Sequence, residues 1–350
     1  MENWRELAGR VLMVGLPGPN LDSATVERLK RLRPGGAILF ARNLESPGQI
    51  RRLLARVHDV LPPPTLLALD QEGGRVSRLE PWIGKTPSAA TLARAGEAAV
   101  RRFALATGYL LRTLGFNLDF APVVDLCDEH ATNGIGDRAY SSDVQTVTRM
   151  AETFLLALQE TGVAGCLKHF PGLGPTNVDS HVSLPTSQRT RDELERFDLV
   201  PYARLAGRAA CVMVGHGHFP GLDATPDLPA TLSRKIVHEL LRSRLAYDGL
   251  VVTDDLEMGA VASLDRDGAA ALRTIEAGCD LLLYCHKLEL AETAVDALAA
   301  RAQSDPLFGA RLSAAARKVE ATAHRWNRWD ADSTEWSEAL NRMKTAADLS

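Results

Sequence analysis

The segment Val163-Ala-Gly-Cys-Leu-Lys-His169 joins five small or apolar residues to a lysine and a histidine. Such a short, continuous apolar run is typical of a strand that is buried on both faces, as in a parallel sheet covered by helices. Seven further runs of this kind predict strands at Val11–Gly15, Gly36–Ala41, Thr65–Asp70, Phe116–Ala121, Cys211–His216, Leu250–Asp254 and Leu281–Cys285. We therefore expect eight parallel strands.

The stretches between these runs have the apolar spacing of amphipathic helices. The predicted helices are Ser23–Leu32, Gln49–Val60, Glu97–Leu114, Asp143–Thr161, Asp192–Ala206, Ser233–Leu245, Asp267–Ala277 and Leu288–Ala302. Eight strands that alternate with helices predict an α/β fold, a (β/α)8 TIM-type barrel. Since no linker divides the chain, residues 1–325 are expected to form a single barrel domain, with residues 326–350 as a C-terminal helix or tail on its outside.

Composition and charge limit the expected partners. The chain carries 40 Lys and Arg against 44 Asp and Glu with no long basic block, so we expect no nucleic-acid partner. No apolar run approaches the roughly 18 residues of a membrane span, and the charged N-terminal stretch does not resemble a signal peptide. We expect no membrane partner and a cytoplasmic location. The five cysteines form no CxxC pair and are expected to be buried free thiols.

Ionisable residues gather where the predicted strands end. In a barrel of this kind the loops that follow the strands meet at one end, where functional side chains lie. The strand ends and their loops carry Asp70, Glu72, Arg78, Asp119, Asp125, Asp137, Arg138, Lys168, His169, His216, Asp254 and Asp255. A lone acid at a strand end is often only the cap of the next helix. Ionisable groups at five consecutive strand ends indicate an active site.

Two segments have the residue types needed for a two-step group transfer. Asp254 and Asp255 are neighbours at a strand end, so their side chains point to opposite faces, and the sequence leaves open which of them faces the barrel mouth. An ionised carboxylate there can attack an electrophilic carbon. In the loop after the fifth strand, Asp179 can orient the imidazole of His181, which then donates and accepts a proton. From spacing alone, the simpler interpretation of Asp179 and His181 is a surface turn pair.

Four motifs occur together in the chain, and in a fixed order. They are Asp70-Gln-Glu-Gly-Gly-Arg-Val76, Lys168-His-Phe-Pro-Gly172, Asp179-Ser-His181 and Thr253-Asp-Asp-Leu-Glu-Met258. With them the chain resembles the β-N-acetylhexosaminidases of glycoside hydrolase family 3, in particular the single-domain cytoplasmic enzymes of bacterial peptidoglycan recycling. The resemblance runs from about Gly9 to about Lys318. It implies a (β/α)8 fold and retaining hydrolysis of terminal β-linked N-acetylglucosamine (GlcNAc) through a covalent glycosyl-enzyme.

The resemblance also implies roles for individual residues. Asp254 is expected to be the nucleophile and His181 the acid/base, with Asp179 as its partner. The residues expected to hydrogen-bond the sugar are Asp70, Arg78, Arg138, Lys168 and His169. The implied substrate is a small saccharide or muropeptide, such as a GlcNAc-anhydroMurNAc peptide, cleaved by a monomer without metal or cofactor. One position departs from the family pattern, because Leu173 stands where a histidine is usual.

Several alternatives stay open at this stage. One alternative is a phosphorylase, in which phosphate instead of water accepts the sugar. A histidine acid/base is compatible with this, since it does not repel an anion as a glutamate does. A metal-dependent barrel hydrolase would use His169, His216, His218 and an aspartate, but its usual His-x-His signature is missing from the first strand end, where Val14-Gly15-Leu16 stands. Leu173 is consistent with a non-catalytic muropeptide-binding protein. A preference for glucosides would place the chain in the β-glucosidase branch of the family.

Overall fold

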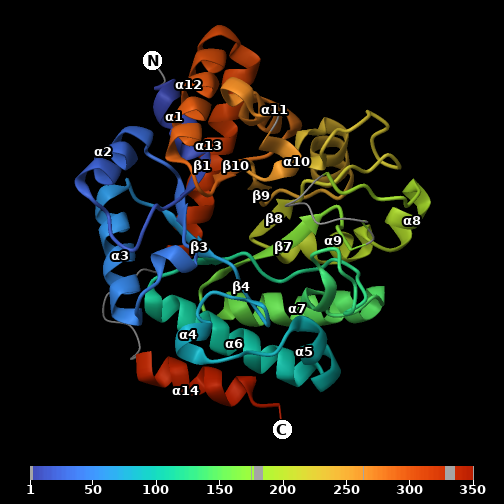
Figure 1. Ribbon diagram of the computed structural model, residues 1–350. Helices are drawn as coiled ribbons and strands as arrows, with labels where there is room; N and C mark the ends of the chain where they lie inside the picture. Colours follow the sequence, from blue (N-terminus) through green and yellow to red (C-terminus); the bar gives the residue numbers. More distant parts are fainter. Residues whose placement is uncertain (1–2, 175, 177–183, 263, 328–335, 350) are drawn as a thin grey trace.

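The computed structural model describes residues 3–174, 176, 184–262, 264–327 and 336–349. Eight strands form a closed parallel barrel in the spatial order β1-β10-β9-β8-β7-β6-β3-β2 (Figure 1). The barrel strands are β1 (Leu12–Gly15), β2 (Gly36–Ile38), β3 (Leu66–Leu69), β6 (Leu118–Asp119), β7 (Ala164–Phe170), β8 (Cys211–Val214), β9 (Leu250–Asp255) and β10 (Leu281–Tyr284). Each overlaps one predicted run, so the predicted (β/α)8 barrel is confirmed.

The continuous apolar runs arise because both faces of the barrel sheet are buried. In β1, Met13 points into the barrel, whereas Leu12 and Val14 belong to the apolar layer between the strands and the helices. Other strands of the barrel repeat this alternation, with inward residues such as Leu118 in β6 and Cys166 in β7. Successive side chains of a strand alternate between two apolar environments, so neither face of the strand is polar. The sequence of each strand is therefore an unbroken apolar stretch.

The helices that connect the strands surround the barrel (Figure 1). In chain order they are α2 (Ser23–Leu32), α3 (Pro47–Val60), α6 (Glu97–Leu114), α7 (Val144–Glu160), α8 (Arg191–Arg196), α9 (Leu199–Leu205), the π-helix η5 (Lys235–Arg244), α11 (Ala269–Ala277) and α12 (Leu288–Ser304). The prediction of one helix over Asp192–Ala206 is wrong, because the chain divides this stretch into α8 and α9. The backbone leaves helical geometry at Phe197, and the next residue turns its carboxylate inward to pair with Arg189.

Shorter helices lie at the ends of the barrel and in its loops. They are α1 (Trp4–Arg10), α4 (Glu80–Ile83), α5 (Ala89–Ala95), α10 (Gly259–Ala262) and the 3-10 turns η1 (Ala41–Asn43), η2 (Gly136–Arg138), η3 (Ala206–Arg208), η4 (Ala230–Leu232) and η6 (Arg266–Gly268). A small antiparallel hairpin, β4 (Gln71–Gly73) and β5 (Val76–Ser77), follows β3. The hairpin was not predicted, and it carries Glu72 into the loop region above the barrel.

Two helices at the C-terminal end of the chain complete the domain. Helix α13 (Pro306–Trp326) begins at the capping side chain of Asp305, which accepts hydrogen bonds from two backbone N–H groups of its first turn. One face of α13 carries Val319, Ala323 and Trp326, and all three join the apolar cluster inside the barrel. Helix α13 therefore closes the end of the barrel that lies opposite the loops after the strands. Helix α14 (Trp336–Ala347) lies against α6 and α4 (Figure 1).

All five cysteines are free and buried, as predicted. Within the described residues, no helix combines the length and the apolar composition that crossing a bilayer requires.

Candidate active site

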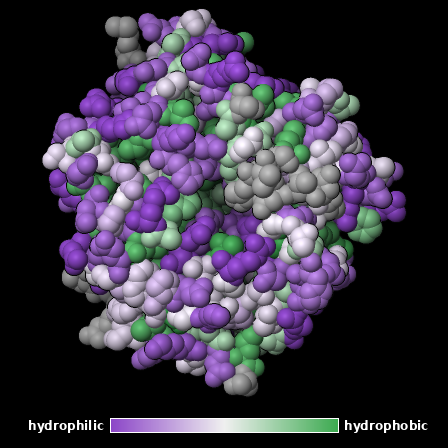
Figure 2. Space-filling model, viewed as in Figure 1, coloured by the Kyte–Doolittle hydropathy of each residue, from purple (hydrophilic) through white to green (hydrophobic). Residues whose placement is uncertain are grey.

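A cavity of about 370 Å³ opens at the carboxyl ends of the barrel strands. Figure 2 shows the surface hollowed near the centre of this face, with hydrophobic atoms inside a largely hydrophilic surround. The apolar floor includes Ile38, Phe120, Met213 and Leu283, which are the last inward-pointing residues of their strands or of the segments that follow them. The charged wall consists of Asp70, Glu72, Arg78, Arg138, Lys168, His169, Asp254, Asp255, Glu257 and His286. An apolar cavity with convergent polar groups is the usual form of a small-molecule site.

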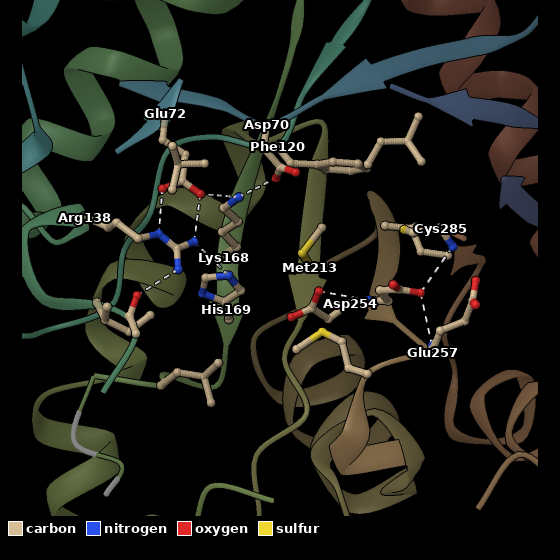
Figure 3. A pocket seen from close by; sticks show the side chains of 18 of the residues that line it. Asp70, Glu72, Phe120, Arg138, Lys168, His169, Met213, Asp254, Glu257 and Cys285 are labelled. Atoms are coloured by element: carbon tan, nitrogen blue, oxygen red, sulfur yellow. Dashed lines mark hydrogen bonds and ion pairs between the residues drawn. The ribbon is translucent and has the colours of Figure 1, made fainter. Parts of the chain in front are cut away.

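Lys168 lies at the centre of a network of ion pairs (Figure 3). Its Nζ is 2.8 Å from Asp70 Oδ1 and 2.6 Å from Glu72 Oε1. Arg138 donates two hydrogen bonds of 2.8 Å to the two oxygens of Glu72, in the bidentate geometry that suits a guanidinium. Arg78 lies 3.6 Å from the other oxygen of Asp70. The network thus joins side chains from three segments of the chain that are far apart in sequence.

These contacts keep Glu72 and Lys168 charged. Burial by itself would raise the pKa of Glu72, but Arg138 and Lys168 outweigh it and hold this pKa far below the ordinary value. Burial would lower the pKa of Lys168, but Asp70 and Glu72 outweigh it and raise this pKa above that of a free lysine. The cavity therefore presents fixed charged donors and acceptors to a polar ligand.

His169 is oriented by a buried carboxylate behind it. Its Nδ1 is 2.7 Å from Asp125 Oδ2, and its Nε2 lies 3.5 Å from a guanidinium nitrogen of Arg138. A carboxylate accepts and a guanidinium donates, so these two contacts favour the tautomer that carries its proton on Nδ1. The lone pair on Nε2 then lies on the side of the ring that faces the cavity wall.

The two adjacent acids of β9 differ in environment. Asp254 is partly exposed to the cavity and faces the network from its other side, next to Met213 (Figure 3). Burial alone would raise the pKa of Asp254, but His216, His169, the backbone N–H of Asp255 and Lys168 together outweigh it, so this pKa lies below its ordinary value. Burial raises the pKa of Asp255 to about 7. Asp254 is therefore the acid that stays ionised at neutral pH and can act as a nucleophile.

The carboxylate of Asp255 is held by hydrogen bonds at the edge of the cavity. Its Oδ1 accepts hydrogen bonds from the backbone N–H groups of Glu257 (3.1 Å) and Cys285 (3.3 Å). Its Oδ2 lies 3.5 Å from His286 Nε2. Both acids line the cavity, so the sequence expectation that only one of them faces the mouth is wrong. The reason is that strand pairing with β10 shifts register at this point, which turns the end of β9 out of simple alternation.

His216 supports the end of β9 from below and does not line the cavity. It is fully buried, with Nε2 2.8 Å from the carbonyl oxygen of Asp255 and Nδ1 2.8 Å from Thr231 Oγ1. Since the carbonyl can only accept, Nε2 carries the proton, and burial lowers the pKa of His216. Both ring nitrogens are occupied, so the three-histidine metal site considered above does not form. Among the residues that the structure describes, no three His, Cys, Asp or Glu side chains cluster in a way that suits a metal ion.

The predicted acid/base pair, Asp179 and His181, lies outside the described residues. Thr176, the last described residue before this segment, and Pro185, the second described residue after it, both line the cavity. Leu173 also lines it and is buried, with its side chain filling the space above Gly215 and Gly217.

The structure thus brings all five predicted sugar-binding residues and Asp254 to one cavity. Asp119, Asp137 and His216 are not among the residues that line it. Asp137 pairs with Arg75 at the surface, and Asp119 accepts the backbone N–H of Gln71 inside the protein. Sequence reasoning did not assign roles to Glu72 and Asp125, although both belong to the strand-end segments. Extended backbone places residues i and i+2 on one face, which is the signal that links Glu72 to Asp70.

The chain matches the model of the glycosyl hydrolase family 3 N-terminal domain over residues 5–321. A β-hexosaminidase from Alkalilimnicola ehrlichii is 36% identical over 342 residues, 95% of each chain. A β-hexosaminidase from Pseudomonas aeruginosa is 38% identical over 292 residues, 82% of this chain and 86% of the other.

Solved structures agree with the sequence comparison. A glycoside hydrolase family 3 β-N-acetylglucosaminidase from Paenibacillus sp. superposes with a TM-score of 0.89 at 32% identity, covering 99% of this chain and 69% of the other. A β-N-acetylhexosaminidase from Beutenbergia cavernae gives a TM-score of 0.83 at 28% identity, covering 93% of this chain and 99% of the other.

A closed (β/α)8 barrel with a charged cavity at the carboxyl ends of its strands defines a barrel enzyme. Together with these matches, it shows that the chain belongs to glycosyl hydrolase family 3 and is a glycoside hydrolase.

Proposed function

We propose that the protein is a retaining β-N-acetylglucosaminidase that removes terminal β-linked GlcNAc from peptidoglycan fragments. In the first step an oxygen of Asp254 attacks the anomeric carbon, the glycosidic bond breaks, and His181 donates its proton to the leaving oxygen. In the second step His181 takes a proton from water, the water oxygen attacks the anomeric carbon, and the bond to Asp254 breaks. Asp179 orients the imidazole of His181 throughout both steps.

The observation that carries the proposal is the ionised carboxylate of Asp254 facing a wall of fixed sugar-binding groups. Its pKa lies below the ordinary value, so at neutral pH it is a ready nucleophile. Asp255, whose pKa is raised to about 7, is less suited to this role. The usual retaining glycosidase has two carboxylates, and in this chain a histidine takes the place of the acid.

The network on the opposite wall suits sugar hydroxyls. Asp70 offers an acceptor oxygen, while Lys168 and Arg138 offer donors that are already held in place by Glu72. Arg78 and His169 also line the cavity, beside Asp70 and Arg138 respectively. A site built of fixed charged groups discriminates strongly against analogues that lack a hydroxyl, because its buried polar groups are then left unpaired.

The acid/base assignment rests on where the segment that contains His181 begins and ends. Thr176 is the last described residue before this segment, Pro185 is the second described residue after it, and both line the cavity. The relatives named β-hexosaminidase and the β-N-acetylglucosaminidase structures support GlcNAc as the sugar. The peptidoglycan aglycone, the monomeric state and the cytoplasmic location are proposed from the sequence resemblance.

Kinetics on aryl glycosides that differ only at C2 test the proposal. We expect the nitrophenyl β-N-acetylglucosaminide to be cleaved much faster than the glucoside. Asp254→Ala should abolish release of nitrophenol, and His181→Ala should slow it strongly. Near wild-type turnover by the Asp254 variant, or a preference for the glucoside, would contradict the proposal. Sugar 1-phosphate as the main product in phosphate buffer would show that phosphate is the acceptor.

A further inference from the structure

Asp125 is a buried carboxylate that the proposed chemistry does not use. It follows β6 and its side chain has no solvent exposure. Its two oxygens contact the imidazole of His169 on one side and two backbone N–H groups on the other. Oδ2 lies 2.7 Å from Nδ1 of His169, and Oδ1 accepts the backbone N–H of Leu173 at 2.7 Å and that of His169 at 3.3 Å.

The first partner is a group of the cavity wall. With its proton directed to Asp125, His169 turns the lone pair of Nε2 toward Arg138 and the cavity. A sugar hydroxyl can then donate to Nε2 in place of the long 3.5 Å contact with Arg138. The opposite tautomer would place an N–H against the guanidinium of Arg138, donor against donor, so the carboxylate fixes which hydrogen bond this ring can make.

The second partner is the start of the loop that leads to His181. Leu173 lies three residues after the end of β7, and its N–H is held by Asp125 Oδ1. The carbonyl oxygen of Leu173 in turn accepts the hydroxyl of Thr176, the last described residue before the segment with Asp179 and His181. The hydrogen bonds thus run without a break from Asp125 to the entrance of that segment.

We propose that Asp125 is a positioning residue with two separable effects, one on each oxygen. Through Oδ2 it sets the tautomer of His169 and so the binding of the sugar. Through Oδ1 it anchors the entry of the acid/base loop and so the proton transfer by His181. This inference rests on the proposed function and deepens it, because it links sugar binding and acid catalysis to one buried group.

Asp125→Asn separates the two effects. The asparagine oxygen can still accept the Leu173 N–H, but its NH2 group can only donate towards His169 Nδ1 and therefore favours the wrong tautomer. We expect KM to rise about tenfold for every aryl N-acetylglucosaminide, a loss of the size that one charge-assisted hydrogen bond gives, with kcat nearly unchanged. In ¹⁵N-histidine NMR spectra, the signals of His169, identified by their loss in His169→Gln, should move from the Nδ1–H to the Nε2–H pattern.

Asp125→Ala removes both contacts, and Asp125→Ser replaces it if the alanine variant does not fold. The measurement is how kcat depends on the leaving group of the substrate. A dinitrophenyl glycoside leaves without protonation, whereas a methoxyphenyl glycoside needs the acid. We expect a kcat loss of about 100-fold on the poor leaving group and little loss on the good one, in parallel with His181→Ala.

The matched control is Asp280→Asn, at the opposite end of the barrel. Asp280 is also buried, and it accepts the backbone N–H of Val251 and pairs with Arg242. This variant should lower Tm and leave KM and the leaving-group pattern unchanged.

The proposal fails if Asp125→Asn keeps the wild-type KM and His169 tautomer. It also fails if Asp125→Ala shows no leaving-group dependence while His181→Ala shows a strong one. If His181→Ala itself shows none, the acid/base assignment of the proposed function is wrong. In that case the proposed effect through Oδ1 is also wrong. The effect through Oδ2 is then tested by the KM of Asp125→Asn and by its NMR spectra alone.

Discussion

Glu72 and Arg138 meet through two parallel hydrogen bonds of 2.8 Å, and one of the same carboxylate oxygens lies 2.6 Å from Lys168 Nζ. Glu72 therefore pairs with two cations of the cavity wall, and both of its oxygens are already occupied. Breaking a buried ion pair is costly because the remaining charges stay buried without a partner.

Glu72→Gln should therefore lower both stability and sugar binding. We expect a loss of about 3 kcal/mol in the free energy of unfolding at pH 7 and a KM at least tenfold higher. Because the pKa of Glu72 is lowered in the folded state, its contribution is present above the ordinary value of 4.5 and declines as the pH falls below it. Urea unfolding at pH 7 and pH 4 checks this.

The control for this prediction is Glu338→Gln, which breaks the exposed pair with Arg342 on α14. It should leave the unfolding midpoint unchanged, since exposed pairs add little. A Glu72 variant as stable as this control would contradict the central role given to Glu72.

Asp255 should give the opposite dependence of stability on pH. Its folded-state pKa of about 7 lies above the ordinary 3.8, so the folded state binds the proton more tightly than the unfolded chain. Its contribution to stability is then greatest below pH 3.8 and declines as the pH rises towards 7. The charged or titratable groups around it are Asp254, Glu257, His286, Arg42, Cys285 and Tyr284.

Asp255→Asn removes this titration and keeps an oxygen for the two backbone N–H groups. We compare the free energy of unfolding of the variant with that of the wild type. The difference, variant minus wild type, should be about 2 kcal/mol more positive at pH 8 than at pH 5. Chemical unfolding at the two pH values measures the difference. Equal differences at both would show that Asp255 is ionised throughout this range.

Gly215 should not tolerate even a methyl group. A Cβ at this position would lie 2.9 Å from His169 Cβ, closer than real Cβ contacts, and 3.0 Å from Leu173 Cδ1, which is also unusually tight. Gly215→Ala should cost about 1–3 kcal/mol of stability and raise KM by displacing His169. Gly207→Ala, where the new methyl group meets no atom within 4 Å, is the matched control. Similar thermal unfolding and kinetics for the two variants would contradict the crowding described at Gly215.

Much of the fold could be predicted because barrel strands are buried on both faces. Segments such as Val163–His169 show this directly as unbroken apolar runs, and β7 follows almost the same residues. Helix α13 was not predicted, although Val319, Ala323 and Trp326 recur at helical spacing. Helix α13 covers the end of the barrel opposite the loops that follow the strands. This end exists only once the sheet has closed, so the sequence alone does not reveal what the helix packs against. The break between α8 and α9 depends on a tertiary ion pair, Arg189 with Asp198, and leaves no local signal.

Site residues could be predicted where they belong to a sequence motif and face the cavity, as Lys168 and His169 do. Glu72 and Asp125 were not assigned because they act on other side chains, and such contacts follow from three-dimensional proximity. Spacing alone also could not separate Asp254 from Asp255. Their difference arises from burial and from the hydrogen bonds around each carboxylate.

The most direct test of the account is covalent trapping with a fluorinated N-acetylglucosaminide, followed by peptide mapping with fragmentation that separates the two adjacent acids. We predict one sugar per protein chain, attached to Asp254, and no label in Asp254→Asn. A fully inactivated enzyme that carries the sugar on Asp255, or carries none, would contradict the claim that Asp254 is the nucleophile.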